Sequence, residues 1–245
     1  MPMLKRSPSL TEQVKSHLKQ RIVASEFEAG RIPSESDLAS ELNVSRNTIR
    51  DALSRLEMEG FVVRRQGAGT FVNQHGLLIK TRLDEIVPYE NLIHEHGYEP
   101  AIKLLCVEEQ PADPGLAATL NLEASEPVLV IHKLFLADAS PVIFNQTHLP
   151  LKWLKRPHTP DDFLAPVYQI LPKLCQQELA YAFSEIVPLI APPWLMDRLA
   201  LPSTPVALLA LEEIGYNPDN DPILKACSYF RDDLLRLRLI RRQSQ

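Results

Sequence analysis

The sequence predicts an α+β protein in two parts: short helices ending in a small hairpin, then a mainly antiparallel sheet covered by helices. Two observations lead to this prediction. Helical periodicity and helix caps dominate residues 10–59, whereas strand patterns separated by turn residues recur from residue 101 onward. The chain has 245 residues, 45% of them hydrophobic, which is enough apolar content for two small cores.

Three helices are expected in the first part. The first carries an apolar stripe that repeats every four residues, at Leu10, Val14, Leu18 and Ile22. A second helix begins after Ser34, because Asp37 completes a near-match to a capping box, and it ends at Asn43. About two residues later, Ser45 is a good N-cap for a third helix, as in a helix-turn-helix. The buried stripe of this third helix is Ile49, Leu53 and Leu56.

The start of the third helix carries side chains that can read DNA. Arg can bond two acceptors of guanine, Asn the donor and acceptor of adenine, and Ser or Thr a phosphate or a base. Gly60 ends the helix, and residues 61–65 and 70–72 read as a basic hairpin around a glycine-rich tip. This order predicts a winged helix-turn-helix that binds double-stranded DNA. The residues expected at DNA are Ser34, Ser45, Arg46, Asn47, Thr48, Arg50, Arg65, Gln66, Gly67, Gly69 and Thr70.

Other basic residues of the first part have more general interpretations. Arg64 could reach a phosphate, whereas Arg31 and Arg55 are interpreted as solvated surface. The formal net charge of the whole chain is −5. Residues 1–75 nevertheless carry 11 Lys and Arg against 9 Asp and Glu, whereas the remainder carries 15 against 22. The basic end is therefore the end with the DNA-reading pattern.

The cysteine spacing, the lengths of the apolar runs and the positions of the histidines favour a cytoplasmic protein without a cofactor. Cys106, Cys175 and Cys227 are far apart and odd in number, which is unlike a zinc or redox motif. No apolar run approaches the length of a membrane helix, and residues 1–9 lack the apolar core of a signal peptide. His94 and His96 fall on different faces of a helix, so no metal site is expected.

Residues 10–73 resemble the winged helix-turn-helix of the GntR-family bacterial transcription regulators. The matching residues are Pro33-Ser34-Glu35, Leu38-Ala39, Val44-Ser45-Arg46, Thr48-Ile49-Arg50, Ala52-Leu53, Leu56, Glu59-Gly60 and Gln66-Gly67-Ala68-Gly69-Thr70-Phe71-Val72. Ser36 and Ala68 depart from the family pattern, because many relatives carry basic residues there. The resemblance therefore implies a DNA-binding domain with fewer phosphate contacts, and with a modest affinity or an atypical operator.

The second part alternates strand and helix signals. Pro88 to Gly97 predicts a helix, and Pro114 to Leu120 a short one behind Asp113. The expected strands are 101–109, 127–137, 141–149, 180–190, 206–216 and 223–231, with a helix over 193–201. A last strand is expected where Leu235, Leu237 and Leu239 alternate with arginines. Asp138-Ala139-Ser140 and residues 217–221 are the turns of two hairpins.

Residues 80–240 resemble the UTRA effector-binding domain of the HutC subgroup of GntR regulators. The marks of the resemblance are Glu126-Pro127-Val128, the Leu134 to Pro141 turn, Leu149-Pro150, Asp221-Pro222-Ile223 and Tyr229-Phe230-Arg231-Asp232-Asp233. UTRA domains resemble chorismate lyase in fold but sense small molecules. We accordingly divide the chain into a DNA-binding domain (8–73), a linker (74–82) that serves as a hinge, and an effector-binding and dimerisation domain (83–241).

The resemblance also implies an effector site. UTRA relatives that sense sugar phosphates carry charged residues at the positions of Lys133, Phe135, Asn145 and Leu224, and a tyrosine at Phe230. Only Lys133 keeps its charge. One cation among apolar residues suits a small organic acid with an apolar body better than a phosphosugar. Arg231 is either a further effector contact or the structural partner of Asp233.

The resulting hypothesis is a homodimeric repressor that binds a palindromic operator and responds to a small-molecule effector. A lyase-like enzyme with a DNA-binding appendage is the alternative, but Asn145 and Leu224 leave it without an acid or base beside the pocket cation. A winged helix that binds only proteins is the third interpretation. It gives no reason for Arg46, Asn47 and Arg50 at the start of one helix.

Overall fold

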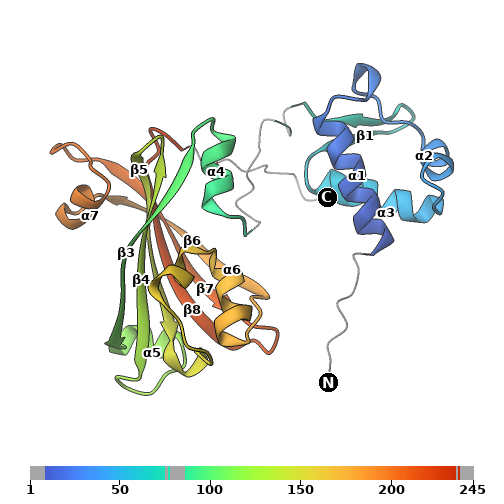
Figure 1. The fold of residues 1–245 in the computed structure, drawn as a ribbon. Coiled ribbons are helices and arrows are strands. Elements are labelled where there is room, and N and C mark those ends of the chain that lie inside the picture. The colour runs from blue at the N-terminus through green and yellow to red at the C-terminus, as the bar shows by residue number, and fades with distance from the viewer. Residues whose placement is uncertain (1–8, 75–76, 78–85, 236, 238–245) are drawn as a thin grey trace. The chain divides into compact units, whose positions relative to one another are not determined.

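The computed structural model describes residues 9–74, 77, 86–235 and 237, which form two compact units (Figure 1). One unit contains the described residues up to Leu77, and the other contains those from Ile86 to Leu237. The linker expected at 74–82 lies outside the described residues, except for Gln74 and Leu77.

The first unit packs three helices against a hairpin. Its elements are α1 (Leu10–Val23), η1 (Glu28–Gly30), α2 (Glu35–Glu41), α3 (Arg46–Met58), β1 (Val62–Arg65) and β2 (Gly69–Val72). Their buried apolar faces form one core that includes Leu18, Leu38, Ile49 and Leu56. Leu10 lies in the first turn of α1, outside that core, and is 53% exposed. The buried stripe of α1 therefore begins at Val14, and the expectation for Leu10 was wrong.

The expected helix ends are confirmed by their hydrogen bonds. Ser34 Oγ accepts from the backbone N–H of Asp37, and the Asp37 carboxylate accepts from Ser34 N, which completes the capping box. Asn43 follows α2 with a φ of 52°, and Gly60 follows α3 with a φ of 84°. Both residue types tolerate this left-handed conformation, which ends a helix.

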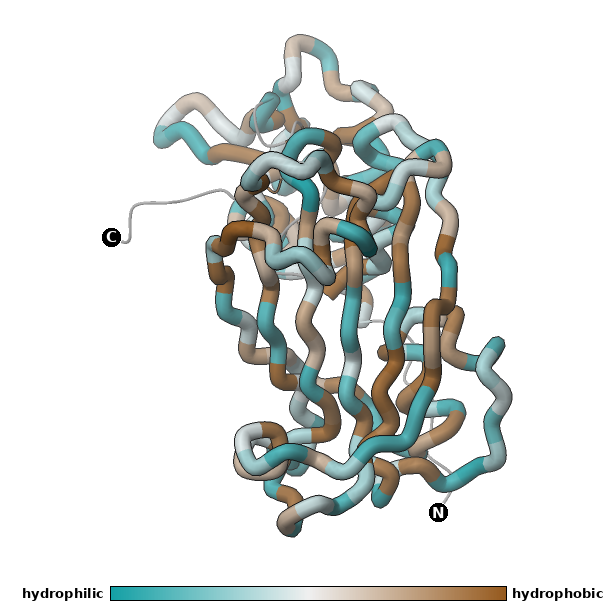
Figure 2. The backbone as a smooth tube through the Cα atoms, turned by 90° about the vertical axis from the view of Figure 1, so that its left-hand side faces the viewer, coloured by the Kyte–Doolittle hydropathy of each residue, from teal (hydrophilic) through white to brown (hydrophobic). Residues whose placement is uncertain are grey.

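The second unit is built on one antiparallel sheet in the order β3-β4-β5-β8-β7-β6 (Figure 1). The strands are β3 (Pro100–Pro111), β4 (Pro127–Ala137), β5 (Ser140–Pro150), β6 (Tyr181–Ile190), β7 (Ala207–Tyr216) and β8 (Pro222–Phe230). Hydrophobic and hydrophilic residues alternate along several of these strands (Figure 2). β4, in contrast, is buried or half-buried at every position after Pro127. Because successive side chains of a strand point to opposite faces, both faces of the sheet are covered there.

Different elements cover the two faces of the sheet. The face that carries Ile131 and Phe135 is covered by α4 (Tyr89–Glu95) and by residues 151–175. These residues form η3 (Leu151–Trp153), η4 (Pro160–Leu164), α6 (Val167–Ile170) and η5 (Leu171–Cys175). The opposite face, which carries Val130 and Leu134, is covered by α5 (Pro114–Thr119) and α7 (Pro193–Arg198). The sequence analysis assigned no element to residues 151–175.

The expected last strand is wrong at its described residues. Leu235 and Leu237 belong to no strand, and Leu239 lies outside the described residues. The chain turns after β8, because Leu235 N donates to the carbonyl of Arg231. Leu235 and Leu237 then both pack into the cluster that contains Phe230. No helix among the described residues has the length and apolar character needed to cross a membrane.

Candidate DNA interface and effector site

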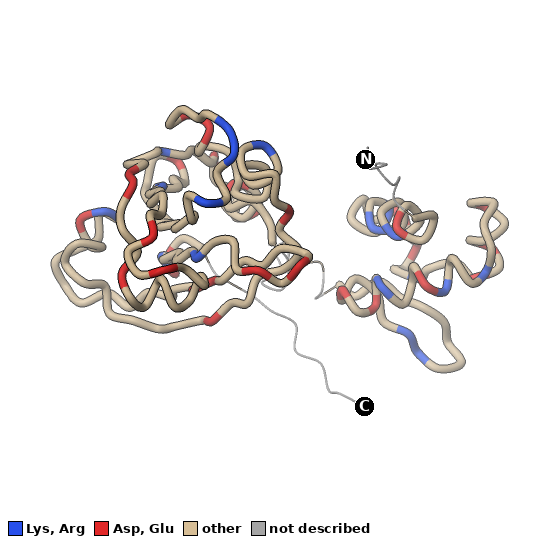
Figure 3. The backbone as a smooth tube through the Cα atoms, turned by 90° about the horizontal axis from the view of Figure 1, so that it is seen from below, with Lys and Arg blue, Asp and Glu red and all other residues tan. Residues whose placement is uncertain are grey.

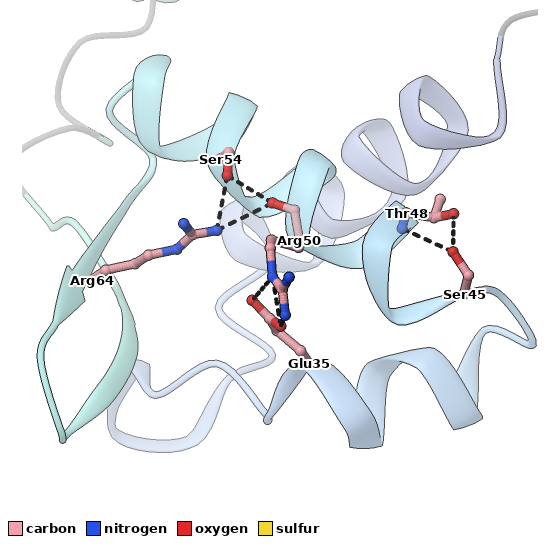
Figure 4. A network of polar contacts seen from close by, with 6 residues as sticks. All are labelled: Glu35, Ser45, Thr48, Arg50, Ser54 and Arg64. Carbon is pink, nitrogen blue, oxygen red and sulfur yellow. Dashed lines mark hydrogen bonds and ion pairs between the residues drawn. The ribbon is translucent and has the colours of Figure 1, made fainter.

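The start of α3 presents two free polar side chains. Ser45 Oγ accepts from Thr48 N at 3.1 Å and also bonds the Thr48 hydroxyl at 2.8 Å, so these two residues cap the helix (Figure 4). Arg46 and Asn47 are exposed. Within the described part of the chain, neither side chain has a hydrogen-bond or ion-pair partner. Both are therefore available to the edges of bases in a major groove.

Arg50 is less free than expected. Its Nη2 lies 3.0 Å from Glu35 Oε2 and its Nε 3.2 Å from the same oxygen (Figure 4). Hydrogen bonding to Glu35 raises the pKa of the Arg50 guanidinium. The pair joins α2 to α3 and neutralises an acid near the expected DNA surface. Arg50 can reach DNA only by sharing or leaving Glu35.

The hairpin forms a wing whose tip is open. Gly67 and Gly69 have φ values of 74° and 112°, which glycine adopts without strain. The Arg65 guanidinium lies 4.9 Å from the centre of the Phe71 ring. Arg31, which was interpreted as surface, extends its Nη2 to within 3.4 Å of the Ala68 carbonyl oxygen and so supports the tip.

A groove runs between the wing and the start of α2. Its lining includes Arg31, Ser34, Glu35, Arg65, Gln66 and Thr70. Acidic and basic residues are interleaved in this unit (Figure 3). Arg64 and Arg65 are the last two residues of β1 in the wing. The expected DNA residues thus lie on two elements, the start of α3 and the wing, with Ser34 beside them at the groove.

A buried polar cluster lies on the sheet of the second unit, between two apolar clusters. Lys133 pairs with Asn145 across β4 and β5, and Asn145 pairs with Ser228 across β5 and β8. Asn145 Nδ2 donates to Ser228 Oγ at 2.9 Å, and the Tyr89 hydroxyl of α4 donates to the same oxygen at 2.8 Å. Thr147 Oγ1 donates to Asn145 Oδ1 at 3.0 Å. We call these five residues the polar cluster.

Lys133 is the buried cation of the polar cluster. It is 6% exposed, and its Nζ donates to the main-chain oxygen of Ala165 at 2.6 Å. Among the described residues, no carboxylate lies within ion-pair distance of this nitrogen. Burial lowers the pKa of Lys133 to about 8, and the field of Glu90 offsets only part of that effect.

Aromatic rings border the polar cluster on one side. Phe135 and Phe230 meet the Tyr89 ring edge to face, at centroid distances of 5.1 and 5.4 Å. Four of the expected effector residues are thus close together: Lys133, Asn145, Phe135 and Phe230. Tyr89, Thr147 and Ser228 were missed, although strand alternation places Thr147 and Ser228 on the same face as Asn145 and Phe230.

Two expected effector residues lie elsewhere. Leu224 is four residues from Ser228 along β8, about 13 Å away at the rise of a strand, and packs beneath residues 151–175. Arg231 directs its guanidinium to the Asp233 carboxylate, at 2.7 and 3.1 Å, and to the carbonyls of Pro141 and Leu199. These contacts favour the structural interpretation of Arg231.

Potential metal ligands are scattered. No group of three or more His, Cys, Asp or Glu residues is placed to hold a metal within the described ranges. His96 Nδ1 lies 2.8 Å from the carbonyl oxygen of Leu92 in its own helix, and His94 is exposed. The three cysteines are free thiols.

Comparison with known proteins assigns a family to both units. Residues 10–72 match the bacterial regulatory proteins of the gntR family, and residues 95–236 match the UTRA domain. Both resemblances expected from the sequence are thus confirmed. Similar solved structures include a possible transcriptional regulator, YydK, from Bacillus subtilis, with a TM-score of 0.73, 14% identity, and coverage of 99% of this chain and 100% of that chain. At this identity the likeness shows the fold alone.

The curated relatives are named as transcription regulators. YurK of Bacillus subtilis, an uncharacterized HTH-type regulator, is 33% identical over 121 residues, 49% of each chain. The histidine utilization repressor of Pseudomonas aeruginosa is 33% identical over 126 residues, 48% of this chain and 49% of that protein. This chain thus matches about half the length of YurK and of the histidine utilization repressor. Its matches to other curated relatives cover from 29% to 63% of those proteins' lengths. Because YurK and the histidine utilization repressor are named as a transcription regulator and a repressor, the lyase alternative has no support.

Proposed function

Because the chain belongs to the gntR family of bacterial regulatory proteins and carries a UTRA domain, we propose that it is an effector-controlled repressor. It binds a palindromic operator as a homodimer, and a small organic acid lowers its affinity for that operator. Several relatives are named as repressors, among them the histidine utilization repressor and an arabinose metabolism repressor. The names support repression as the direction of control for this chain.

The start of α3 carries the DNA-binding part of the proposal. Arg46 and Asn47 are exposed on the first turn, and the hydroxyls of Ser45 and Thr48 fix the position of that turn. One recognition helix reads only a few base pairs, so a two-fold dimer that reads a palindrome doubles the site. Because the DNA backbone is a polyanion, the affinity of the protein for DNA should also fall as the salt concentration rises.

Lys133 carries the effector part of the proposal. A buried ammonium with a single main-chain acceptor is poorly compensated, and an anion would supply the missing charge. The rings of Phe135, Phe230 and Tyr89 pack edge to face beside the polar cluster and supply apolar surface there. This combination favours a carboxylate with an apolar body over a phosphosugar, which presents hydroxyls and a second negative charge.

Control follows from linkage between the two ligands. An effector that favours the state with low DNA affinity must itself bind more weakly when DNA is present. Such couplings are typically about 1–3 kcal/mol, or roughly 5- to 150-fold. The linker at 74–82 is the proposed hinge for this change, and it lies largely outside the described residues.

Calorimetry of the full chain tests the class of effector. Panels of apolar carboxylates and of phosphosugars are titrated into the protein, and each binder is then added to the protein–DNA complex. We expect a carboxylate to bind and to release DNA, and Lys133→Ala to abolish the release while leaving unliganded DNA binding intact. Tight binding of a phosphosugar with silent carboxylates would contradict the organic-acid proposal but leave the repressor proposal standing.

A further inference from the structure

Arg64 of the wing binds the recognition helix. Its Nη2 donates to the Arg50 carbonyl oxygen at 3.1 Å and to Ser54 Oγ at 3.0 Å (Figure 4). Its Nε lies 3.5 Å from Glu57 Oε2, and its backbone N–H donates to Glu57 Oε1 at 3.1 Å. One strand residue thus contacts three helix residues, spaced four and three apart along one side of α3.

Strand alternation gives Arg64 and Arg65 different surroundings. Val62, two residues before Arg64 on the same face of β1, is buried in the core with α3. Arg65 points to the other face, where its guanidinium lies over the Phe71 ring. Two adjacent arginines of one basic hairpin therefore do different things: Arg64 contacts α3, and Arg65 remains available on the wing.

The contacts of Arg64 extend to α2. Ser54 Oγ donates to the Arg50 carbonyl oxygen at 2.8 Å. The two oxygens that accept from Arg64 Nη2 are therefore also hydrogen-bonded to each other. The side chain of Arg50 in turn bonds Glu35 at the start of α2 (Figure 4). Wing, recognition helix and preceding helix are thereby connected by one continuous set of polar contacts. A guanidinium can hold several acceptors at fixed angles, which an ammonium cannot do.

We propose that Arg64 is a positioning residue: by binding the Arg50 carbonyl and Ser54, it fixes the wing against α3. The start of α3 and the wing tip then reach DNA at a set spacing. This inference rests on the proposed DNA-binding function, and it assigns Arg64 a role other than a phosphate contact. A wing that swings freely would still bind DNA but would discriminate less between sequences.

The test uses the full chain with three variants, Arg64→Gln, Ser54→Ala and the double variant. The probes are a duplex selected in vitro by the wild-type chain and a scrambled duplex of the same length and composition. We expect each single variant to lower the preference for the selected duplex about tenfold, the size expected for losing hydrogen bonds to a charged group. The double variant should be no worse than Arg64→Gln, because both changes remove the same contact.

Charge and geometry are separated by Arg64→Lys and by salt dependence. Positioning requires the guanidinium, so Arg64→Lys should also lose the preference, and the salt dependence of Arg64→Gln should match that of wild type. If Arg64 instead touches a phosphate, Arg64→Lys keeps its affinity and Ser54→Ala has no effect. Arg64→Gln then weakens both duplexes equally and lowers the slope of log affinity against log salt by about 0.9. That pattern would overturn the proposal.

Two variants separate a loss of discrimination from a loss of folding. Alanine has a higher helix propensity than serine, so Ser54→Ala should not lower the melting temperature, and its loss of discrimination cannot then be attributed to unfolding. Arg55→Lys is the matched control, because Arg55 lies on α3 but pairs with Glu12 of α1. Failure of the proposed function would appear in the wild type, which would select no duplex. Failure of the present inference would appear only in the variants.

Discussion

Lys133 and Ala165 are joined by a hydrogen bond of 2.6 Å between a buried ammonium and a main-chain oxygen. Ala165 directly follows η4, so the bond ties the covering segment 151–175 to strand β4. An anion that reaches Nζ would compete with this carbonyl for the same protons. Binding of an anion at Lys133 would therefore loosen the contact between β4 and residues 151–175.

The first prediction concerns stability at alkaline pH. The Lys133 pKa is about 8 in the folded chain and about 10.4 when unfolded, so the unfolded chain binds more protons between these values. The free energy of unfolding should therefore rise from pH 8 to 10 through this group. Denaturant unfolding across this range should show the rise in wild type, and Lys133→Met should lack that component.

The comparison with Lys133→Met isolates Lys133 from its neighbours. Glu90 and Tyr89 on α4, Tyr168 on α6 and Glu213 on β7 are titratable groups around the polar cluster. These groups are present in both the wild type and Lys133→Met, as is the nearby thiol of Cys227. Equal pH slopes in the two proteins would show that Lys133 keeps an ordinary pKa. At pH 7, Lys133→Met should stabilise the chain by about 1–3 kcal/mol, because it removes a buried charge.

The second prediction concerns Gly215, which faces Leu224 across β7 and β8. A Cβ at position 215 would lie 2.8 Å from Leu179 Cδ1 and 2.9 Å from Leu224 Cγ. Gly215→Ala should therefore cost about 1–3 kcal/mol of unfolding free energy by overpacking. In the double variant with Leu224→Ala, the two costs should be less than additive. Strict additivity would mean that the added methyl group does not meet Leu224.

Sequence patterns predicted the elements that depend on local chemistry. The caps at Ser34 and Ser45, the glycine stop at Gly60 and the two apolar runs of β4 and β5 about their turn each follow from a few neighbouring residues. Residues 151–175 escaped prediction because their helices are three to five residues long, too short to show a period.

The candidate sites depend on contacts that sequence spacing does not reveal. Glu35 and Arg50 are fifteen residues apart, and Tyr89 and Ser228 are 139 apart. Leu224 was assigned to the effector site from a family position, yet the strand rise separates it from Ser228. Arg64 and Arg65 look equivalent in sequence, and only the packing of β1 against α3 distinguishes them.

The third prediction concerns Arg46. Its side chain is exposed on the first turn of α3 and has no partner in the described part of the chain. Arg46→Ala should weaken binding to cognate DNA by about 1–3 kcal/mol if the guanidinium makes a bidentate base contact. Fluorescence anisotropy on selected and scrambled duplexes measures the loss. An equal loss on both would show that Arg46 touches only phosphate.

The last prediction concerns β6, one of the two edge strands of the sheet. Tyr181, Phe183, Ile186, Val187 and Ile190 are exposed along its ten residues. A long apolar edge favours pairing with another strand, and a two-fold axis would place the same strand of a second copy there. Phe183→Glu and Ile186→Lys should therefore give monomers of the full chain in sedimentation velocity at micromolar concentration. Residues 78–245 alone should dimerise as wild type does.

Val23→Lys is the control for these changes, because Val23 is 64% exposed on α1, in the other unit. It should leave the dimer intact. The β6 variants should also bind a palindrome on the order of 10²-fold more weakly, because linked half-sites then become independent ones. A wild-type monomer would contradict the homodimer itself. If β6 forms the interface, either change buries an unpaired charge between the two strands and should break the dimer. A dimer that survives both changes would therefore place the interface on another surface.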